Sequence, residues 1–190
     1  SKNNQIHTQT EMDIEQFVAQ TEGEWKSMRS AHSLAFQQFE DVLSEISIQK
    51  LSQTNTDLQT ILKQEGDLNI SDIKSPFLMK WAAESDWEPD DPNDVANGEC
   101  IIVPIPKNKK SGVLLRSIGY AESIAARSEY SFLDDGTFVL KTKYDQSIAE
   151  ERIWFISENV RCRSSVLKTS EGSGILQTSF SSEVRRLTNS

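Results

Sequence analysis

The sequence predicts an all-β protein in which about ten antiparallel strands close into an up-and-down barrel, with an N-terminal helix and one further short helix. Apolar and polar residues alternate with a period of two through most of residues 129–187, as expected for strands that bury one face. Short turns separate these segments, and Asp134–Asp135–Gly136 has the composition of a tight hairpin turn. Closure into a barrel is favoured over a sandwich because it leaves no exposed strand edge.

The two helices are expected at residues 12–22 and 57–64, where apolar residues recur at helical spacing. In the first segment, Asp13 and Glu15 fall in the first turn, where acidic side chains interact favourably with the helix dipole. In the second, Asn55 precedes the apolar stripe as a candidate N-cap.

The remaining periodic segments predict the strands, which are joined mainly by short connections. They are expected at residues 25–39, 44–51, 77–83, 99–105, 112–126, 129–133, 137–144, 150–156, 160–167 and 175–185. Residues 12–187 are expected to form a single barrel domain, and the polar residues 1–11 an extension outside it.

Charge and hydropathy exclude two classes of protein. The 190 residues carry a net charge of −9, which argues against binding nucleic acid through general electrostatics. No apolar run approaches the length of about 18 residues that predicts a membrane span. The charge is uneven, because residues 101–190 hold thirteen Lys and Arg against ten Asp and Glu. Any anion-binding chemistry is therefore expected in the C-terminal half.

The cysteines and histidines predict neither a metal site nor a catalytic thiol. Cys100 and Cys162 belong to no closely spaced pair, and His7 and His32 have no zinc-ligand spacing. A disulfide between the two cysteines stays open, but two reduced thiols are the favoured interpretation.

Charged residues alternate along the last strands, and two interpretations are open. Arg161 and Arg163 share one face of their strand, Glu183 lies on one face of the final strand, and Glu151 shares a face with apolar residues. These side chains either form a solvated outer face with cross-strand ion pairs or line a ligand cavity inside the barrel. Inside, the arginines would need carboxylate partners from the protein or the ligand. The pattern alone does not choose.

Three further side chains have open roles. Trp87 lies in the polar segment 84–94, where it is a candidate flap over a ligand or a partner contact. Trp154 is expected in the core or on the outer face of the barrel under a helix, and Arg29 is by default a surface residue.

Four ordered blocks resemble the S-type phycobiliprotein lyases, the CpcS/CpeS family, and together they span roughly residues 12–186. The blocks are Gly23–Phe36, Leu114–Glu122, Glu151–Phe155 followed by Asn159–Val166, and Ser179–Arg185. The chain departs from the family pattern at Met28, Ser33 and Ser181, where members often carry Gln, His and Cys. The departures do not touch the Arg and Glu positions.

The resemblance implies a barrel like those of lipocalins and fatty-acid-binding proteins, and a lyase activity. The substrate would be a phycobilin, an open-chain tetrapyrrole such as phycoerythrobilin or phycocyanobilin, bound non-covalently, with no prosthetic group. The lyase would attach it through a thioether to a cysteine of an apo-phycobiliprotein subunit of phycocyanin or phycoerythrin type. The compartment would be cyanobacterial cytoplasm or an algal plastid, and a homodimer or a heterodimer is left open.

The resemblance also suggests site residues. The catalytic residues would be Glu151, Arg161 and Glu183, and the bilin-binding residues Arg29, Trp81, Trp87 and Arg163. The guanidinium groups would pair with the two propionates, the carboxylates would accept from pyrrole N–H groups and keep the bilin protonated, and the indoles would stack on the rings. The alternatives are a non-catalytic bilin chaperone and a lipid or fatty-acid carrier, of which the lipid carrier predicts a mainly apolar cavity.

Overall fold

The computed structural model describes residues 11–34, 36–66, 68–83, 97–117, 124–171 and 174–187. Within these ranges the helices are α1 (Ile14–Thr21) and α2 (Thr56–Glu65), with a short 3-10 helix at Ile70–Asp72. The strands are β1 (Gly23–Ser33), β2 (Gln38–Lys50), β3 (Phe77–Ala83), β4 (Asn97–Asn108), β5 (Ser111–Ser117), β6 (Ile124–Phe132), β7 (Phe138–Lys143), β8 (Ser147–Ser157), β9 (Val160–Thr169) and β10 (Ile175–Arg185).

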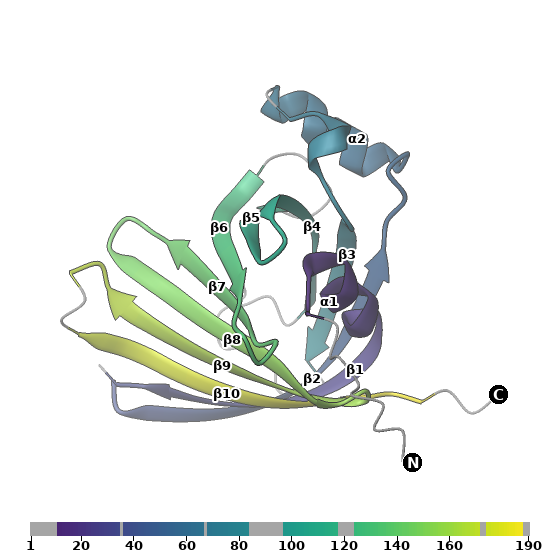
Figure 1. Cartoon of the computed structure of the whole chain (residues 1–190). Coiled ribbons are helices and arrows are strands. Elements are labelled where there is room, and N and C mark those ends of the chain that lie inside the picture. Colours follow the sequence, from purple (N-terminus) through teal and green to yellow (C-terminus); the bar gives the residue numbers. More distant parts are fainter. Residues whose placement is uncertain are drawn as a thin grey trace, which may run out of the picture.

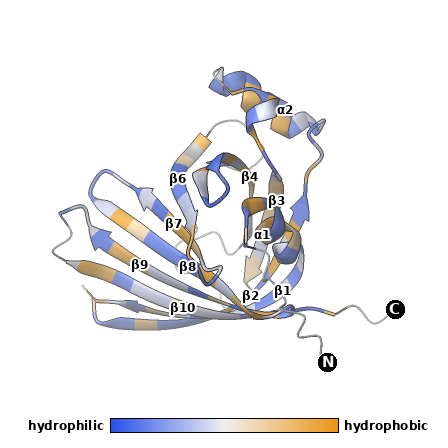
Figure 2. Cartoon of the chain, in the orientation of Figure 1, coloured by the Kyte–Doolittle hydropathy of each residue, from blue (hydrophilic) through white to orange (hydrophobic). Residues whose placement is uncertain are grey.

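The described strands form the expected closed antiparallel barrel of ten strands (Figure 1). Each strand pairs with the next in sequence, and β1 pairs with β10 to close the sheet, with Trp25 opposite Arg185 and Ser33 opposite Gln177. Hydrophilic and hydrophobic residues alternate along β8, β9 and β10 (Figure 2). Closure satisfies the backbone hydrogen bonds of both terminal strands, so the barrel has no open edge.

One strand boundary predicted from the sequence is wrong. The segments 25–39 and 44–51 were expected as separate strands, but β1 ends at Ser33 and β2 already begins at Gln38. The turn between them contains no Gly or Pro, and Gln37 takes the positive φ of 50° that such a turn requires. The sequence therefore carries no ordinary turn signal at this position.

A second predicted strand is divided. The segment 112–126 contains the end of β5 at Ser117 and the start of β6 at Ile124, and residues 118–123 lie outside the described part of the chain. The hairpin turn between β6 and β7 is as expected, and Gly136 in it has a φ of +87°.

Helix α1 closes one end of the barrel. Asp13 caps the helix: its side chain accepts from the backbone N–H of Gln16 at 2.9 Å, and the Gln16 side chain accepts from the Asp13 N–H at 3.3 Å. The buried face of α1 includes Phe17, whose ring stacks on Phe138 with centroids 4.4 Å apart. The ring of Phe17 also makes an edge contact with Phe155 of β8 at 6.1 Å. These contacts hold α1 at the end of the barrel where β7 begins and β8 ends.

Helix α2 packs in a second apolar cluster, separate from the one that contains α1. Its buried residues Leu58, Ile61 and Leu62 pack with Val103 and Leu115 of β4 and β5. The two α-helices are eight and ten residues long, and no helix in the described ranges has the length and hydrophobicity needed to cross a membrane.

The packing of α1 predicts a large effect of Phe17→Ala. Loss of the stacked ring leaves a cavity beneath the helix, and we expect a decrease of about 3–5 kcal/mol in the free energy of unfolding, measured in urea. Gln20→Ala, on the exposed face of the same helix, is the control and should change this free energy by less than about 0.5 kcal/mol. Equal effects of the two substitutions would contradict the packing of α1 against the core of the barrel.

Candidate functional site

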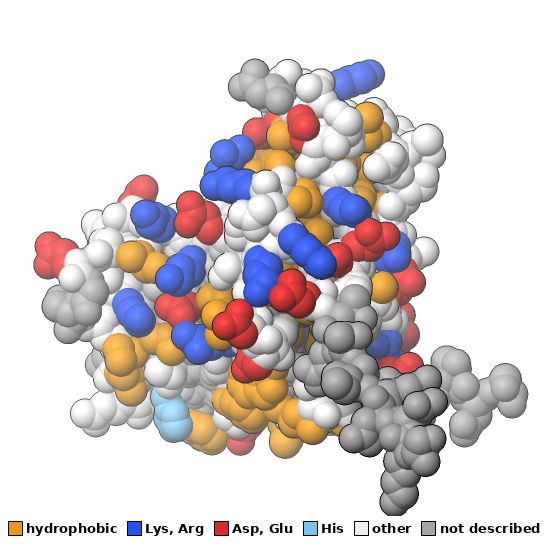
Figure 3. Space-filling view, viewed as in Figure 1, with side chains coloured by type: hydrophobic (Ala, Val, Ile, Leu, Met, Phe, Trp, Pro, Cys, Tyr) orange, Lys and Arg blue, Asp and Glu red, His pale blue; other side chains and the backbone are white. Residues whose placement is uncertain are grey.

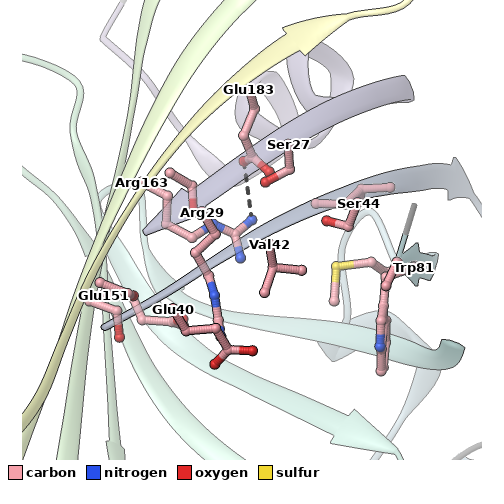
Figure 4. A pocket seen from close by; sticks show the side chains of 15 residues that line it. Ser27, Arg29, Glu40, Val42, Ser44, Trp81, Glu151, Arg163 and Glu183 are labelled. Carbon is pink, nitrogen blue, oxygen red and sulfur yellow. Dashed lines mark ion pairs between the residues drawn. The ribbon is translucent and has the colours of Figure 1, made fainter. Parts of the chain in front are cut away.

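A cavity of about 480 Å³ lies inside the barrel, walled by β1, β2, β3, β8, β9 and β10 (Figure 4). Its ionisable lining residues are Arg29, Glu40, Glu151, Arg163 and Glu183. Of the two interpretations left open by the strand pattern, the inward orientation is therefore correct for Glu151, Arg163 and Glu183. The lining is mixed, because the apolar side chains of Val42, Ile46, Met79 and Ala83 lie beside these charged groups.

The base of the cavity is a buried ion pair between neighbouring strands. Glu183 of β10 lies directly opposite Arg161 of β9 on one side and Ser27 of β1 on the other. Arg161 Nε donates to Glu183 Oε1 at 2.9 Å, and both side chains are 1% exposed. Arg163 Nη2 lies 3.6 Å from the same oxygen (Figure 4), and the Ser27 hydroxyl hydrogen-bonds the carboxylate. One carboxylate thus holds two guanidinium groups.

Arg161 lies behind this carboxylate and is not among the residues that line the cavity. Its Nη1 donates to Thr21 Oγ1 at 3.3 Å, and its guanidinium carbon lies 4.7 Å from the centroid of the Trp25 ring. Trp25 in turn donates from Nε1 to the Thr21 carbonyl at 2.8 Å. Arg161 therefore fixes Glu183 against the floor of the barrel, whereas the sequence suggested that it contacts a ligand directly.

The electrostatics keep the pair ionised at neutral pH. Burial alone would raise the pKa of the Glu183 carboxyl, but Arg163 and Arg161, together with the Ser27 hydrogen bond, outweigh burial and hold the pKa below its ordinary value of 4.5. Burial lowers the pKa of the Arg161 guanidinium to about 10, against the opposing effect of Glu183. Both groups are charged near pH 7, as a stable buried pair requires.

Two arginine side chains in the cavity have N–H donors that the described residues leave without an acceptor. The Nε of Arg163 is buried, and among the described residues it has no hydrogen-bond acceptor. Arg29 points into the cavity from β1, and no carboxylate in the described ranges forms an ion pair with it. A buried donor without an acceptor is costly, so a ligand that supplies carboxylates would bind favourably here.

The predicted indoles have different positions. Trp81 lines the cavity from β3, and its ring lies over Gly98 of β4, directly opposite in the sheet. A Cβ at residue 98 would lie 2.3 Å from Cζ2 of Trp81, so glycine is required for this ring position. The ring centroids of Trp154 and Phe180 are 6.3 Å apart. Trp154 lies on the face of β8 opposite to that of Glu151, so it points away from the cavity. Trp87 lies outside the described residues.

Glu40 and a set of small polar residues also line the cavity, although the strand pattern did not single them out. Glu40 lies in β2 with the same parity as Ile46, which also lines the cavity, but the predicted strand began only at residue 44. The serines that line the cavity are Ser27, Ser44, Ser165, Ser179 and Ser181. Strand alternation in β9 and β10 placed the last three on the same faces as the charged residues, which was the available signal.

Neither cysteine is a candidate nucleophile in the cavity. Cys100 and Cys162 are free and buried, and neither lines the cavity. Burial raises the pKa of the Cys100 thiol to about 11 and also raises the pKa of Cys162. A thiol with a raised pKa is protonated near pH 7 and reacts slowly as a nucleophile.

Comparison with known proteins gives consistent matches over nearly the whole chain. The sequence model of the CpeS-like protein family matches residues 13–186. Chromophore lyase CpcS/CpeS 3 from Trichodesmium erythraeum is 48% identical over 176 residues, which cover 92% of this chain and 99% of that protein. Phycocyanobilin lyase subunit CpcS from Picosynechococcus is 30% identical, over 82% of this chain and 78% of that protein. The structure of the S-type phycobiliprotein lyase CPES from Guillardia theta matches with a TM-score of 0.78 and 37% identity, over 94% of this chain and 95% of that one.

The ion pair predicts a pH-dependent cost for Glu183→Gln. Because the folded-state pKa of Glu183 is lowered, its stabilisation is fully present above pH 4.5 and is lost as the pH falls through the folded pKa. At pH 7 we expect the variant to lose about 3–5 kcal/mol of unfolding free energy in urea, and this loss should shrink below pH 4.5. Glu45→Gln, whose residue forms an exposed ion pair with Arg186 at 3.4 Å, is the control and should cost less than about 1 kcal/mol. A loss that did not change with pH would contradict the assignment.

The contact between Gly98 and Trp81 predicts a displaced indole in Gly98→Ala. The added methyl group occupies the space of the ring, so the near-ultraviolet circular dichroism and the tryptophan fluorescence should change. Gly174→Ala, where a Cβ would meet its nearest atom at 3.5 Å, is the control and should leave both spectra unchanged. If the Gly98 variant gave wild-type spectra, the ring would not lie against this glycine.

Proposed function

The chain belongs to the CpeS-like protein family, and from this premise and the geometry of the cavity we propose that it is a phycobiliprotein lyase. It binds a phycobilin non-covalently inside the barrel and attaches the bilin through a thioether to a cysteine of an apo-phycobiliprotein subunit. The observation that carries the proposal is the pair of inward-facing arginines, Arg29 and Arg163, beside the carboxylates of Glu151 and Glu183. Among the described residues, Arg163 Nε has no acceptor and Arg29 forms no ion pair.

The arginines match the anionic groups of the ligand. A phycobilin carries two propionates, and Arg29 and Arg163 supply one guanidinium each on adjacent parts of the cavity wall. A planar guanidinium binds a carboxylate through two parallel N–H bonds, which gives both affinity and a fixed orientation. Arg161 acts as a positioning residue, because it holds Glu183, and Glu183 holds Arg163.

The carboxylates match the pyrrole N–H groups. Glu151 faces the cavity from β8, and in the described part of the chain it forms no ion pair, so its oxygens are free to accept. Glu183 is ionised at neutral pH and lies on the same side of the cavity. A carboxylate beside the central nitrogens favours the protonated tetrapyrrole, which is the better electrophile. Trp81 offers a flat surface on which one ring of the bilin stacks.

The attachment is an addition that needs no redox cofactor. The S–H of the acceptor's cysteine adds across the ethylidene double bond of the bilin: the C–S bond forms, and the proton ends on the ring carbon that carried the double bond. The nucleophile belongs to the acceptor, which agrees with the burial of Cys100 and Cys162 in this chain. The chain contributes orientation and electrostatic stabilisation of the protonated bilin. The cyanobacterial source of the Trichodesmium and Picosynechococcus lyases supports cyanobacterial cytoplasm or an algal plastid as the compartment.

The test measures binding and transfer separately. Mixing the protein with phycocyanobilin should give a sharpened, red-shifted visible band, and Arg163→Gln should weaken the bilin affinity by about tenfold to a hundredfold because one charge-assisted contact is lost. Arg152→Gln, a neighbouring arginine that does not line the cavity, is the matched control and should bind as the wild type does.

Transfer is then followed with an apo-phycobiliprotein as acceptor, on a denaturing gel with zinc-enhanced fluorescence. The proposal predicts a covalent adduct that forms faster than in a reaction without the chain, and more slowly with Glu151→Gln. A red-shifted band without accelerated attachment would identify a bilin chaperone. No band with phycocyanobilin or phycoerythrobilin would contradict the proposal, and binding of a fatty acid in its place would identify a lipid carrier.

A further inference from the structure

The outer wall of the barrel carries a second concave site, of about 680 Å³, over β4 to β9. We define it as the basic groove by its cationic residues, which are Lys107, Arg127, Lys141, Lys143 and Lys168. Lys and Arg side chains gather over β6, β7 and β8 in the space-filling view (Figure 3). Two carboxylates, Glu129 and Glu150, also line the groove, so it has a surplus of three positive charges on a chain of net charge −9.

The strand register separates the groove into two rows. In the first row, Lys141 of β7 lies directly between Glu129 of β6 and Glu150 of β8, so its charge is balanced. In the second row, Lys143 of β7 lies opposite Ile148 of β8, which lies opposite Lys168 of β9.

The second row holds cations without carboxylates. Arg127, two residues before Glu129 in β6, adds a further cation beside it. Within the described ranges, Lys107, Arg127 and Lys143 form no ion pair, and Lys168 reaches Glu150 only at 4.0 Å. Neighbouring like charges repel one another, so this row is stabilised when an external anion binds it.

The groove and the cavity are on opposite sides of one wall. In β8, Glu151 faces the cavity and Glu150 faces the groove. In β9, Ser165 lines the cavity and Lys168 lines the groove. Helix α1 packs at the end of β7 that contains Phe138, whereas Lys143 lies at the opposite end of the same strand. The carboxylate-free row is therefore at the end of the barrel that α1 does not close.

From this arrangement we propose that the basic groove docks an acidic surface of the acceptor protein. The inference rests on the proposed function, because it identifies the partner as the apo-phycobiliprotein that receives the bilin. We expect an acceptor that takes the bilin to approach the end of the barrel opposite α1, and the second row lies on the outer face of that end. Ile148 and Val113 give the groove apolar contact area between the charges, as protein interfaces usually have.

The two carboxylates favour a protein as the occupant over a phosphate polymer or an anionic vesicle. Glu129 and Glu150 repel a surface of uniform negative charge, whereas a protein surface can place its own cation opposite each of them. Anionic lipid and nucleic acid are therefore outcomes that the test must separate from the acceptor.

The test is the double charge reversal Arg127→Glu with Lys143→Glu, both in the second row. The matched control is Lys50→Glu with Lys63→Glu, which makes the same change in net charge at exposed positions outside the groove. Binding of the bilin-free variants to an apo-phycobiliprotein is measured by calorimetry at two salt concentrations. We expect the groove variant to lose about tenfold in affinity and most of its salt dependence, and the control to keep both.

The visible absorption band of the bound bilin tests the proposed function independently of acceptor docking. The groove variant should keep the wild-type band with phycocyanobilin, and its transfer rate should fall at low acceptor concentration and recover at saturation. Equal losses in both variants, no loss in either, or a lost bilin band in the groove variant would overturn the inference. So would binding of phosphatidylglycerol vesicles or duplex DNA that is strong in the wild type and lost in the groove variant. An absent band in the wild-type protein would instead contradict the proposed function.

Discussion

The ion pair between Arg161 and Glu183 is the interaction on which the cavity depends. A charge inside a β-barrel is stable only when it is paired and hydrogen-bonded, and this pair is supported by Thr21, Ser27 and the ring of Trp25. With Glu183 fixed, Arg163 is held at the cavity wall, and its Nε has no acceptor in the described part of the chain. The barrel can therefore keep a charged cavity beside the apolar core that packs against α1, and such a cavity suits the acidic, N–H-bearing pigment of the proposed function.

The sequence predicted the barrel and the helices well because both follow from local periodicity and turn composition. Strand alternation also placed Arg161 and Arg163 correctly on one face, but it could not tell which face was inside, since both faces of β9 mix polar and apolar residues. Barrel closure decides that question. Glu40 was missed because the turn at residues 34–37 has no glycine, and Gln37 adopts the positive φ without a sequence signal. The depth of Arg161 behind Glu183 depends on three-dimensional packing that no pattern encodes.

The strands β8 and β9 carry both sites, one on each face. Their inward residues bind the pigment in the proposed function, and their outward residues contribute to the basic groove. Period-two alternation makes this possible, because a strand presents independent sets of side chains to its two sides. The uneven charge of the two halves of the sequence follows from the same arrangement, since most of the cations of the cavity floor and the groove come from residues 101–190. The two proposals therefore predict that pigment binding and acceptor docking can be changed separately by substitution.

A crystal structure of the protein soaked with phycocyanobilin is the most direct test of the inward-facing charges. The account predicts the tetrapyrrole inside the barrel, with its propionates on Arg29 and Arg163, a carboxylate at its central nitrogens, and the pair of Arg161 and Glu183 unchanged beneath it. A bilin bound only on the outer surface, or one whose propionates pointed away from both arginines, would contradict it.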